Sequence, residues 1–132
     1  MFSIRVDSEQ NIICLHFFGN FDSKQGESLC YILPGYMDKL TPGFTLLSDL
    51  SKLRKMDLKV YKFFERIMDI CNEHGVARVV RVINKDTPDI GFNIMSLFHY
   101  SENVTILTCG SEQEAETYLK PQNKEDKISG IS

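Results

Sequence analysis

An amphipathic helical pattern followed at once by a β-branched run is the feature that most constrains how this chain folds. From Lys59 to His74, apolar side chains recur at i, i+3, i+4, i+7, i+8 and i+11, with charged residues between them. Gly75 is suited to terminate the helix, and the segment from Val76 to Ile83 is rich in valine. Such a run is typical of an interior strand in a parallel sheet whose faces are covered by helices. The two segments together predict an α/β domain.

The segments before this pair alternate between strand and helix patterns. Phe2–Val6 and Ile12–Phe18 predict a β-hairpin, because a polar turn separates them. Asp22, with Gln25 at the capping-box position, predicts a helix that runs to about Leu40 and is kinked or split at Pro34-Gly35. Phe44–Leu47 predicts a short strand that ends in Ser48-Asp49-Leu50-Ser51 and leads into a basic loop with Lys52, Arg54 and Lys55.

The segments after residue 83 continue the alternation. Thr87, with Pro88 at the first helical position, caps a third expected helix. A fifth strand is expected over Asn103–Thr108, and Ser111 with Glu114 forms a capping box for a short last helix. The order ββαβαβαβα predicts a mixed, largely parallel five-stranded sheet packed by four helices. The expected domain covers residues 1–120, and the polar segment 121–132 is expected to be a disordered tail.

Length and charge narrow the class of partner. A chain of 132 residues suits one compact domain, and 15 Lys+Arg against 18 Asp+Glu give a net charge of -3. This balance argues against nucleic acid, which selects basic surfaces. No apolar run approaches the roughly 20 residues that span a bilayer, and residues 1–5 lack the order of a signal peptide. We therefore expect a cytoplasmic protein without a membrane span.

The cysteines and histidines are too scattered to predict a metal site, a disulfide framework or a cofactor. No C-x-x-C pair or H-E-x-x-H motif occurs. His16 is expected to be a packed histidine rather than a ligand. Cys109 lies near an expected helix start, where its pKa could be lowered, but a buried thiol at a strand end is the more common case. The residues concerned are Cys14, Cys30, Cys71, Cys109, His16, His74 and His99.

Two short motifs resemble a known family. Gly19-Asn20-Phe21-Asp22 ends the hairpin like a Gly-x-Leu-Asp entry to a first helix, and Asp49-Leu50-Ser51 follows the third strand. Over residues 1–120 the chain resembles the STAS-like domains of the anti-sigma-factor antagonists, which have the SpoIIAA-like fold. The resemblance implies this fold and a non-catalytic regulatory role based on protein interaction. Asp57 sits where such domains carry the Asp of an Asp-Ser switch.

The chain departs from the family directly after Asp57. Leu58 occupies the position of the phosphorylatable serine and is followed by Lys59 and Val60, so the hydroxyl and the glycine of the motif are absent. The resemblance is therefore closer to the divergent STAS/SEC14-like branch. It leaves open an alternative function, the binding of a lipid or another small apolar ligand, which predicts an internal cavity between the second and third helices.

The third expected helix has two apolar stripes and no charged residue between Ile90 and Ser101. One stripe can pack against the hydrophobic core of the domain. The second predicts an interaction surface for a protein partner or a second copy of the chain, although a neighbouring helix or loop within the monomer could equally cover it. The residues of this predicted surface are Phe92, Met95, His99 and Tyr100.

A second candidate site is expected at the carboxyl ends of the parallel strands, where open α/β sheets bind ligands. Helix N-termini and lysines there could hold a carboxylate or phosphate. The alternative is a set of ordinary loops whose polar residues cap helices. Catalysis has little support, since a carboxylate pair such as Asp49 and Asp57 would also need a pocket and a shifted pKa. The residues of this anion or ligand site are Asp49, Ser51, Lys52, Asp57 and Lys85.

Overall fold

The computed structural model describes residues 1–84, 86, 100 and 103–119, and every structural statement below concerns these residues. The helix expected from Thr87 and the expected tail at 121–132 lie outside them, so both stay predictions. The elements are β1 (Phe2–Asp7), β2 (Ile12–Phe21), α1 (Ser23–Met37), β3 (Thr45–Met56), the 3₁₀ helix η1 (Leu58–Val60), α2 (Tyr61–Glu73), β4 (Arg78–Val82), β5 (Thr105–Cys109) and α4 (Glu112–Leu119).

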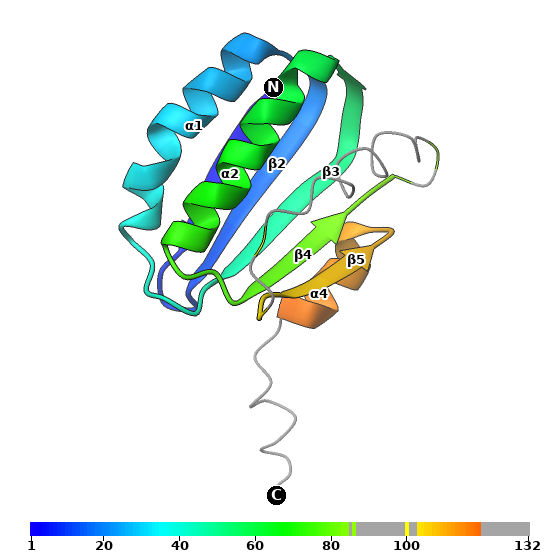
Figure 1. The fold of residues 1–132 in the computed structure, drawn as a ribbon. Helices are drawn as coiled ribbons and strands as arrows, with labels where there is room; N and C mark the ends of the chain where they lie inside the picture. Colours follow the sequence, from blue (N-terminus) through cyan, green and yellow to red (C-terminus); the bar gives the residue numbers. More distant parts are fainter. Residues whose placement is uncertain (85, 87–99, 101–102, 120–132) are drawn as a thin grey trace, which may run out of the picture.

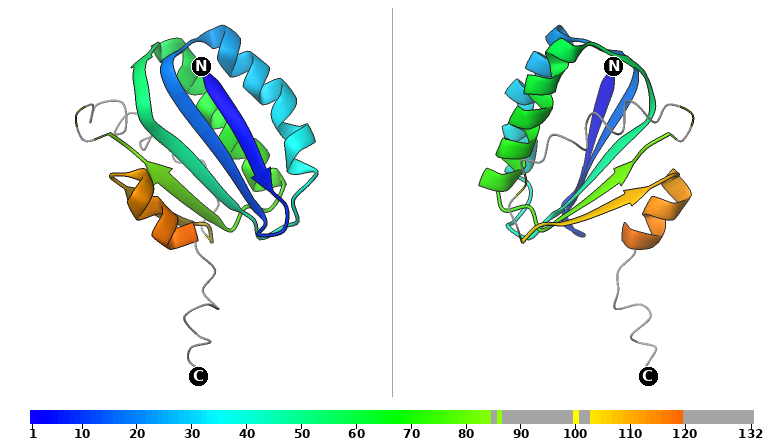
Figure 2. Two further views of the ribbon diagram at one scale, coloured as in Figure 1. Left: turned by 180° about the vertical axis from the view of Figure 1, so that it is seen from behind. Right: turned by 45° about the vertical axis from the view of Figure 1, so that its right-hand side comes forward.

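The five strands form one sheet in the order β1-β2-β3-β4-β5. β1 is antiparallel to β2, and all other neighbours are parallel. Figure 1 shows α1 and α2 side by side over one face of the sheet, and Figure 2 shows α4 on the other face. The predicted α/β class and mixed sheet are confirmed. The described residues contain three α-helices rather than the predicted four, and none of these is long and apolar enough to cross a membrane.

The sequential strand order explains why the two faces are covered unequally. Each parallel crossover steps to the next position in the same direction, and right-handed crossovers then place their helices on one face. α1 and α2 bury the larger core, which includes Ile13, Leu15 and Phe17 of β2. The residues that alternate with these, Ile12 and Cys14, belong to a smaller core under α4. The α4 face is therefore the less covered side of the sheet.

Predicted caps begin the helices. The Asp22 carboxylate accepts from Gln25 N at 3.0 Å, and Ser111 Oγ accepts from Glu114 N at 3.2 Å. α1 runs from Ser23 to Met37 as one helix, so of the two predicted outcomes at Pro34-Gly35 the split is wrong, and the helix ends before the predicted Leu40. Leu33 and Met37, both fully buried, anchor the helix on either side of the proline, and this packing offsets the lost backbone hydrogen bond.

β3 is much longer than its sequence predicts. It continues to Met56, so Lys52, Arg54 and Lys55 lie in a strand and the predicted basic loop is wrong. The register from His16↔Asp49 to Phe18↔Lys52 contains one extra residue on β3, and a second extra residue lies between Gly19↔Leu53 and Asn20↔Lys55. The first of these bulges changes which face of the sheet the following side chains of β3 point to. Leu50 and Leu53, three positions apart, therefore both enter the α1/α2 core.

Beyond the first bulge the sheet narrows to two strands. β1 pairs with β2 only as far as Phe17, and β4 pairs with β3 only as far as Asp49. We call residues 18–21 of β2 and 52–56 of β3 the ribbon. Its α2 face is held by an aromatic cluster, in which the Phe21 ring centroid lies 5.0 Å from that of Phe17 and 5.4 Å from that of Phe64.

The contact between α1 and α2 depends on Gly26, and this generates a prediction. A Cβ at this position would lie 2.6 Å from Phe63 Cδ2 and 2.9 Å from Phe63 Cβ, so the helices would have to separate. We expect Gly26→Ala to lower the free energy of unfolding by about 1–3 kcal/mol in urea denaturation. Gly35→Ala is the matched control, because a Cβ there meets nothing within 4 Å. The control should stabilise α1 by up to about 1 kcal/mol, and equal effects of the two variants would contradict this packing.

Candidate functional site

One lateral row of the sheet positions the candidate site. Ser3 pairs with His16, His16 with Asp49, and Asp49 with Val82. Lateral neighbours in a sheet point to the same face, and here this is the α4 face that also holds Cys14 and Leu47. The row places an imidazole, a carboxylate and a hydroxyl side by side on the less covered face.

Asp49 is the centre of the site. It is only 2% exposed, which is unusual for a carboxylate. Its Oδ1 accepts two hydrogen bonds from Ser51, one from the backbone N at 2.9 Å and one from Oγ at 2.6 Å. Its Oδ2 is buried and has no hydrogen-bond partner among the described residues. Among the described residues, His16 Nε2 lies 3.7 Å from Oδ2, and it is charged only when the imidazole is protonated.

Glu112, the first residue of α4, completes the cluster. One donor atom from each of His16, Asp49 and Glu112 lies within 4.8 Å of the others. Lys52 Nζ lies 3.6 Å from Glu112 Oε1, and this lysine side chain is 70% exposed. These four residues line a cavity of about 230 Å³ together with Ser3, Phe17 and Phe18.

A larger groove adjoins this cavity. Its volume is about 590 Å³, and it runs along the ribbon beside the end of β4. Asn84 Nδ2 donates to Ser51 O at 3.1 Å, which ties the end of β4 to the bulge next to Asp49. The groove is lined by Phe18, Gly19, Ser51, Lys52, Leu53, Arg54, Asn84 and Asp86.

The structure brings together part of the predicted anion or ligand site. Asp49 and Ser51 are in direct contact, and Lys52 lines the same cavity as Asp49. Asp57 lines neither this cavity nor the adjoining groove. Its carboxylate instead caps η1 by accepting a hydrogen bond from Lys59 N at 3.0 Å. Lys85 falls outside the described residues, so its part in the site stays a prediction.

Most of the predicted interaction surface also falls outside the described residues. Phe92, Met95 and His99 are not among them. Tyr100 is half-buried and packs against the larger core, with the Arg81 guanidinium 5.8 Å from its ring centroid. Burial raises the pKa of the Tyr100 phenol well above its usual value. Tyr100 thus has a packing role within the monomer, whatever the other three residues do.

Cys109 is a buried thiol at the end of β5, the more common of the two cases considered for it. Burial, and secondarily the charge of Glu114, raise the pKa of its thiol. Burial also raises the pKa of Cys71 to about 12. Since the thiolate is the reactive form, these two cysteines are poor nucleophiles.

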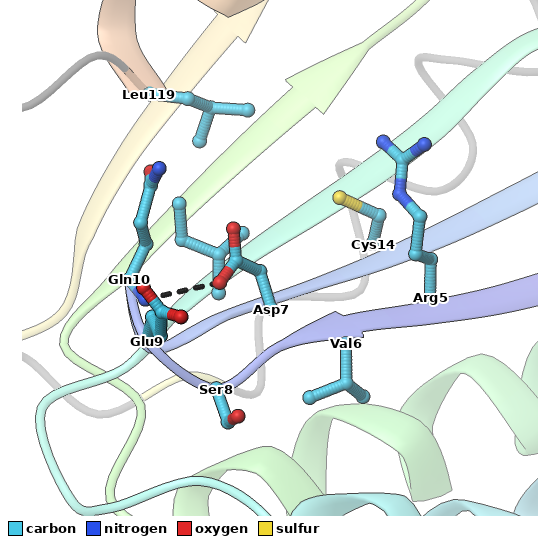
Figure 3. Close-up of a pocket in the computed structure, with 9 residues that line it drawn as sticks. Arg5, Val6, Asp7, Ser8, Glu9, Gln10, Cys14 and Leu119 are labelled. Atoms are coloured by element: carbon cyan, nitrogen blue, oxygen red, sulfur yellow. Dashed lines mark hydrogen bonds between the residues drawn. The ribbon is translucent and has the colours of Figure 1, made fainter.

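A third hollow lies at the opposite end of the sheet, around the β1–β2 turn. Figure 3 shows Val6 pointing toward the α1/α2 side, whereas Arg5 and Cys14 point to the other side of the sheet, on which Leu119 at the end of α4 also lies. The hollow measures about 490 Å³. Asp7 accepts from Gln10 N at 3.1 Å and so shapes the turn. The wall of this hollow is formed mostly by the polar β1–β2 turn, and none of the residues that line it is a buried carboxylate like Asp49.

Comparison with known proteins places the fold. No family model matches the chain, and no curated protein matches it. Among solved structures, an uncharacterised protein of the DUF3478 family with a SpoIIAA-like fold, from Shewanella loihica PV-4, is similar with a TM-score of 0.65 at 12% identity, and 91% of this chain and 93% of that chain are covered. The unphosphorylated anti-sigma factor antagonist SpoIIAA is similar with a TM-score of 0.56 at 14% identity, covering 99% and 100%.

The chain has the SpoIIAA-like fold. SiaC of Pseudomonas aeruginosa is a further similar structure, with a TM-score of 0.53 at 10% identity, covering 83% of this chain and 88% of that one. The predicted STAS-like resemblance is therefore confirmed at the level of fold. At identities this low, similarity of fold does not assign roles to individual residues. The function of the site therefore follows from its own geometry.

Two residues of the cluster in this SpoIIAA-like domain were missed by sequence reasoning. Sequence analysis predicts a packed histidine at His16 and assigns no role to Glu112. The alternation of β2 does place His16 on one face with Cys14. Its approach to Asp49 depends on the β2–β3 register, and the approach of Glu112 depends on where α4 returns over the sheet, neither of which a spacing motif reports.

The Ser51 hydroxyl generates a prediction. It is one of two donors to Asp49 Oδ1, and an alanine at this position would keep only the other, the backbone N–H. We expect Ser51→Ala to lower the free energy of unfolding by about 1.5–3 kcal/mol, the usual worth of a hydrogen bond to a charged group. Ser48→Ala is the matched control, because Ser48 lies on the same strand and its side chain makes no hydrogen bond in the described part of the chain. Urea denaturation at neutral pH measures both. Equal stability of the two variants would mean that the Ser51 hydroxyl does not support the Asp49 carboxylate.

Proposed function

We propose that this chain is a non-catalytic, cytoplasmic regulatory module that binds a protein partner through the surface around Leu58. The observation that carries the proposal is the exposure of Leu58, which is 73% exposed although leucine is among the side chains most often buried. It lies in η1, directly after the ribbon and before α2. An apolar side chain at such a prominent position is suited to be an anchor in a partner's pocket.

The charges around Leu58 indicate the chemistry of the partner. Arg54, Lys55 and Lys59 are all exposed, and we call these three residues the basic rim. Asp57 is also exposed, but its carboxylate is engaged by Lys59 N. The chain as a whole is acidic, with a net charge of -3, so the basic rim stands out locally. We infer a partner that presents an apolar pocket bordered by acidic side chains, which the basic rim would steer into place.

The identity of residue 58 bears on how the interaction is controlled. The family resemblance assigns this position to the phosphorylatable serine of an Asp-Ser switch. A leucine has no hydroxyl to phosphorylate, and its side chain adds apolar contact area instead. We therefore propose a contact that is not gated by phosphorylation at this position.

Proteins that share the fold are consistent with a regulatory role. SpoIIAA is an anti-sigma factor antagonist, and SiaC is the activator in a complex with the diguanylate cyclase SiaD. Both are described as acting on another protein, which supports partner binding here. The alternative of an apolar ligand required a cavity bounded by α2 and the helix expected from Thr87. That helix lies outside the described residues, so the alternative stays a prediction.

Replacing Leu58 tests the proposal. We expect Leu58→Asp to weaken partner binding at least about 30-fold, corresponding to about 2 kcal/mol for a buried anchor. The measurement is affinity capture from an extract of the source cells with quantitative mass spectrometry, followed by titration of the purified partner. Tyr31→Asp is the matched control, since Tyr31 is 86% exposed and lies in α1 rather than in η1 or the ribbon.

The result has clear alternatives. A protein retained by the wild type and by Tyr31→Asp, but lost with Leu58→Asp, supports the proposal. Capture that Leu58→Asp leaves unchanged would refute this surface. Reversing the charges of Arg54 and Lys55 should slow association, and added salt should reduce the difference from wild type.

A further inference from the structure

We propose that His16, Asp49 and Glu112 form a binding site for a divalent first-row transition metal ion, with Zn²⁺ as the best match. The three side chains come from β2, β3 and the first turn of α4, and their donor atoms converge within 4.8 Å of one another. This proposal does not depend on the partner surface at Leu58, because it concerns other residues on the α4 face of the sheet.

The buried oxygen of Asp49 is the observation that points to a ligand. Oδ1 already accepts two hydrogen bonds from Ser51, whereas Oδ2 is buried and has no hydrogen-bond partner in the part of the chain that the structure describes. A desolvated carboxylate oxygen is costly unless a cation or donor compensates it. His16 Nε2, at 3.7 Å, is beyond hydrogen-bond distance. A metal ion between the two atoms would satisfy both.

The backbone fixes two of the three ligands. His16 and Asp49 are register partners on adjacent strands, so their relative position is set by the sheet. Donors bound at about 2 Å to one Zn²⁺ lie roughly 3–3.5 Å apart, which is close to the observed separation of this pair. The Glu112 side chain is 50% exposed and can move inward to complete the site. Binding would draw the three donor atoms, which lie within 4.8 Å of one another, closer together around one ion.

The donor set selects the class of ion. One imidazole nitrogen with two carboxylate oxygens suits Zn²⁺ and related transition metals. Mg²⁺ and Ca²⁺ favour all-oxygen sites. Three protein ligands also leave at least one coordination position open toward the cavity of about 230 Å³.

Lys52 is the group that opposes metal binding. Its Nζ lies 3.6 Å from Glu112 Oε1, and its side chain is 70% exposed. An exposed ion pair of this kind contributes little to stability, so the lysine can swing into solvent when an ion binds. Its charge should nevertheless weaken cation binding. Removing it should therefore strengthen binding, an effect that a purely structural role for the cluster would not produce.

Calorimetric titration of the untagged, EDTA-treated full chain with ZnCl₂ tests the proposal. We expect one Zn²⁺ per chain, and an affinity at least about tenfold weaker in both His16→Gln and Glu112→Gln. Lys52→Met should bind more tightly than wild type. Glu116→Gln is the matched control, because Glu116 is an exposed residue of the same helix outside the cluster. Circular dichroism without metal verifies that each variant is folded.

A second measurement identifies the ligand directly. The chain has three histidines, and Zn²⁺ should shift the ring ¹⁵N resonances of His16 while those of His74 and His99 stay unchanged. Absence of saturable binding would overturn the proposal. So would unchanged affinity in either His16→Gln or Glu112→Gln, or a Zn²⁺ response confined to another histidine.

Discussion

The parallel pairing of β2 with β3 is the constraint on which the rest of this structure depends. Its first part, from Ile12↔Thr45 to His16↔Asp49, is the middle of the sheet and carries residues of both hydrophobic cores. Its second part, past the bulge, carries the chain to Asp57 and thereby sets where α2 begins. A one-residue slip in this register would exchange the two faces of β2. It would separate His16 from Asp49 and remove Ile13, Leu15 and Phe17 from the core.

Much of the fold could be predicted because its local signals agree with one another. The α2 pattern, the valine-rich run of β4 and the caps at Asp22 and Ser111 each specify one element through short-range physics. β3 could not be predicted in full, because its bulges break the period of two on which strand recognition depends. Leu50 and Leu53 share a core although their spacing is odd. Without the bulge in view, Ser48-Asp49-Leu50-Ser51 has the composition of a turn.

The candidate site was predictable only where its residues are neighbours in the sequence, since Asp49, Ser51 and Lys52 lie within β3 and not at its end. Asp49, Ser51 and Lys52 are neighbours in the sequence, so any fold keeps them close. His16 and Glu112 are 33 and 63 residues from Asp49, and they reach it only through sheet register and the return of α4. Sequence alone gives no distance for such pairs. The buried Asp49 Oδ2, which has no hydrogen-bond partner among the described residues, distinguishes this cluster from ordinary capping residues and is likewise a property of the folded molecule.

The narrowing of the sheet at the ribbon has a mechanical consequence. A two-stranded ribbon is less stable by itself than a sheet of several strands, so the ribbon, which we also call the arm, is expected to bend more easily than the five-stranded part of the sheet. The aromatic cluster under α2 buttresses one side of this arm, while the groove beside Arg54 and Asn84 borders the other. The N-terminal amine adds a further tie, because it donates to Phe18 O and Asn20 O of the ribbon. A partner that pushes on Leu58 would displace the ribbon, and the displacement would reach the first bulge. That bulge lies beside the Ser51 hydrogen bonds that hold Asp49.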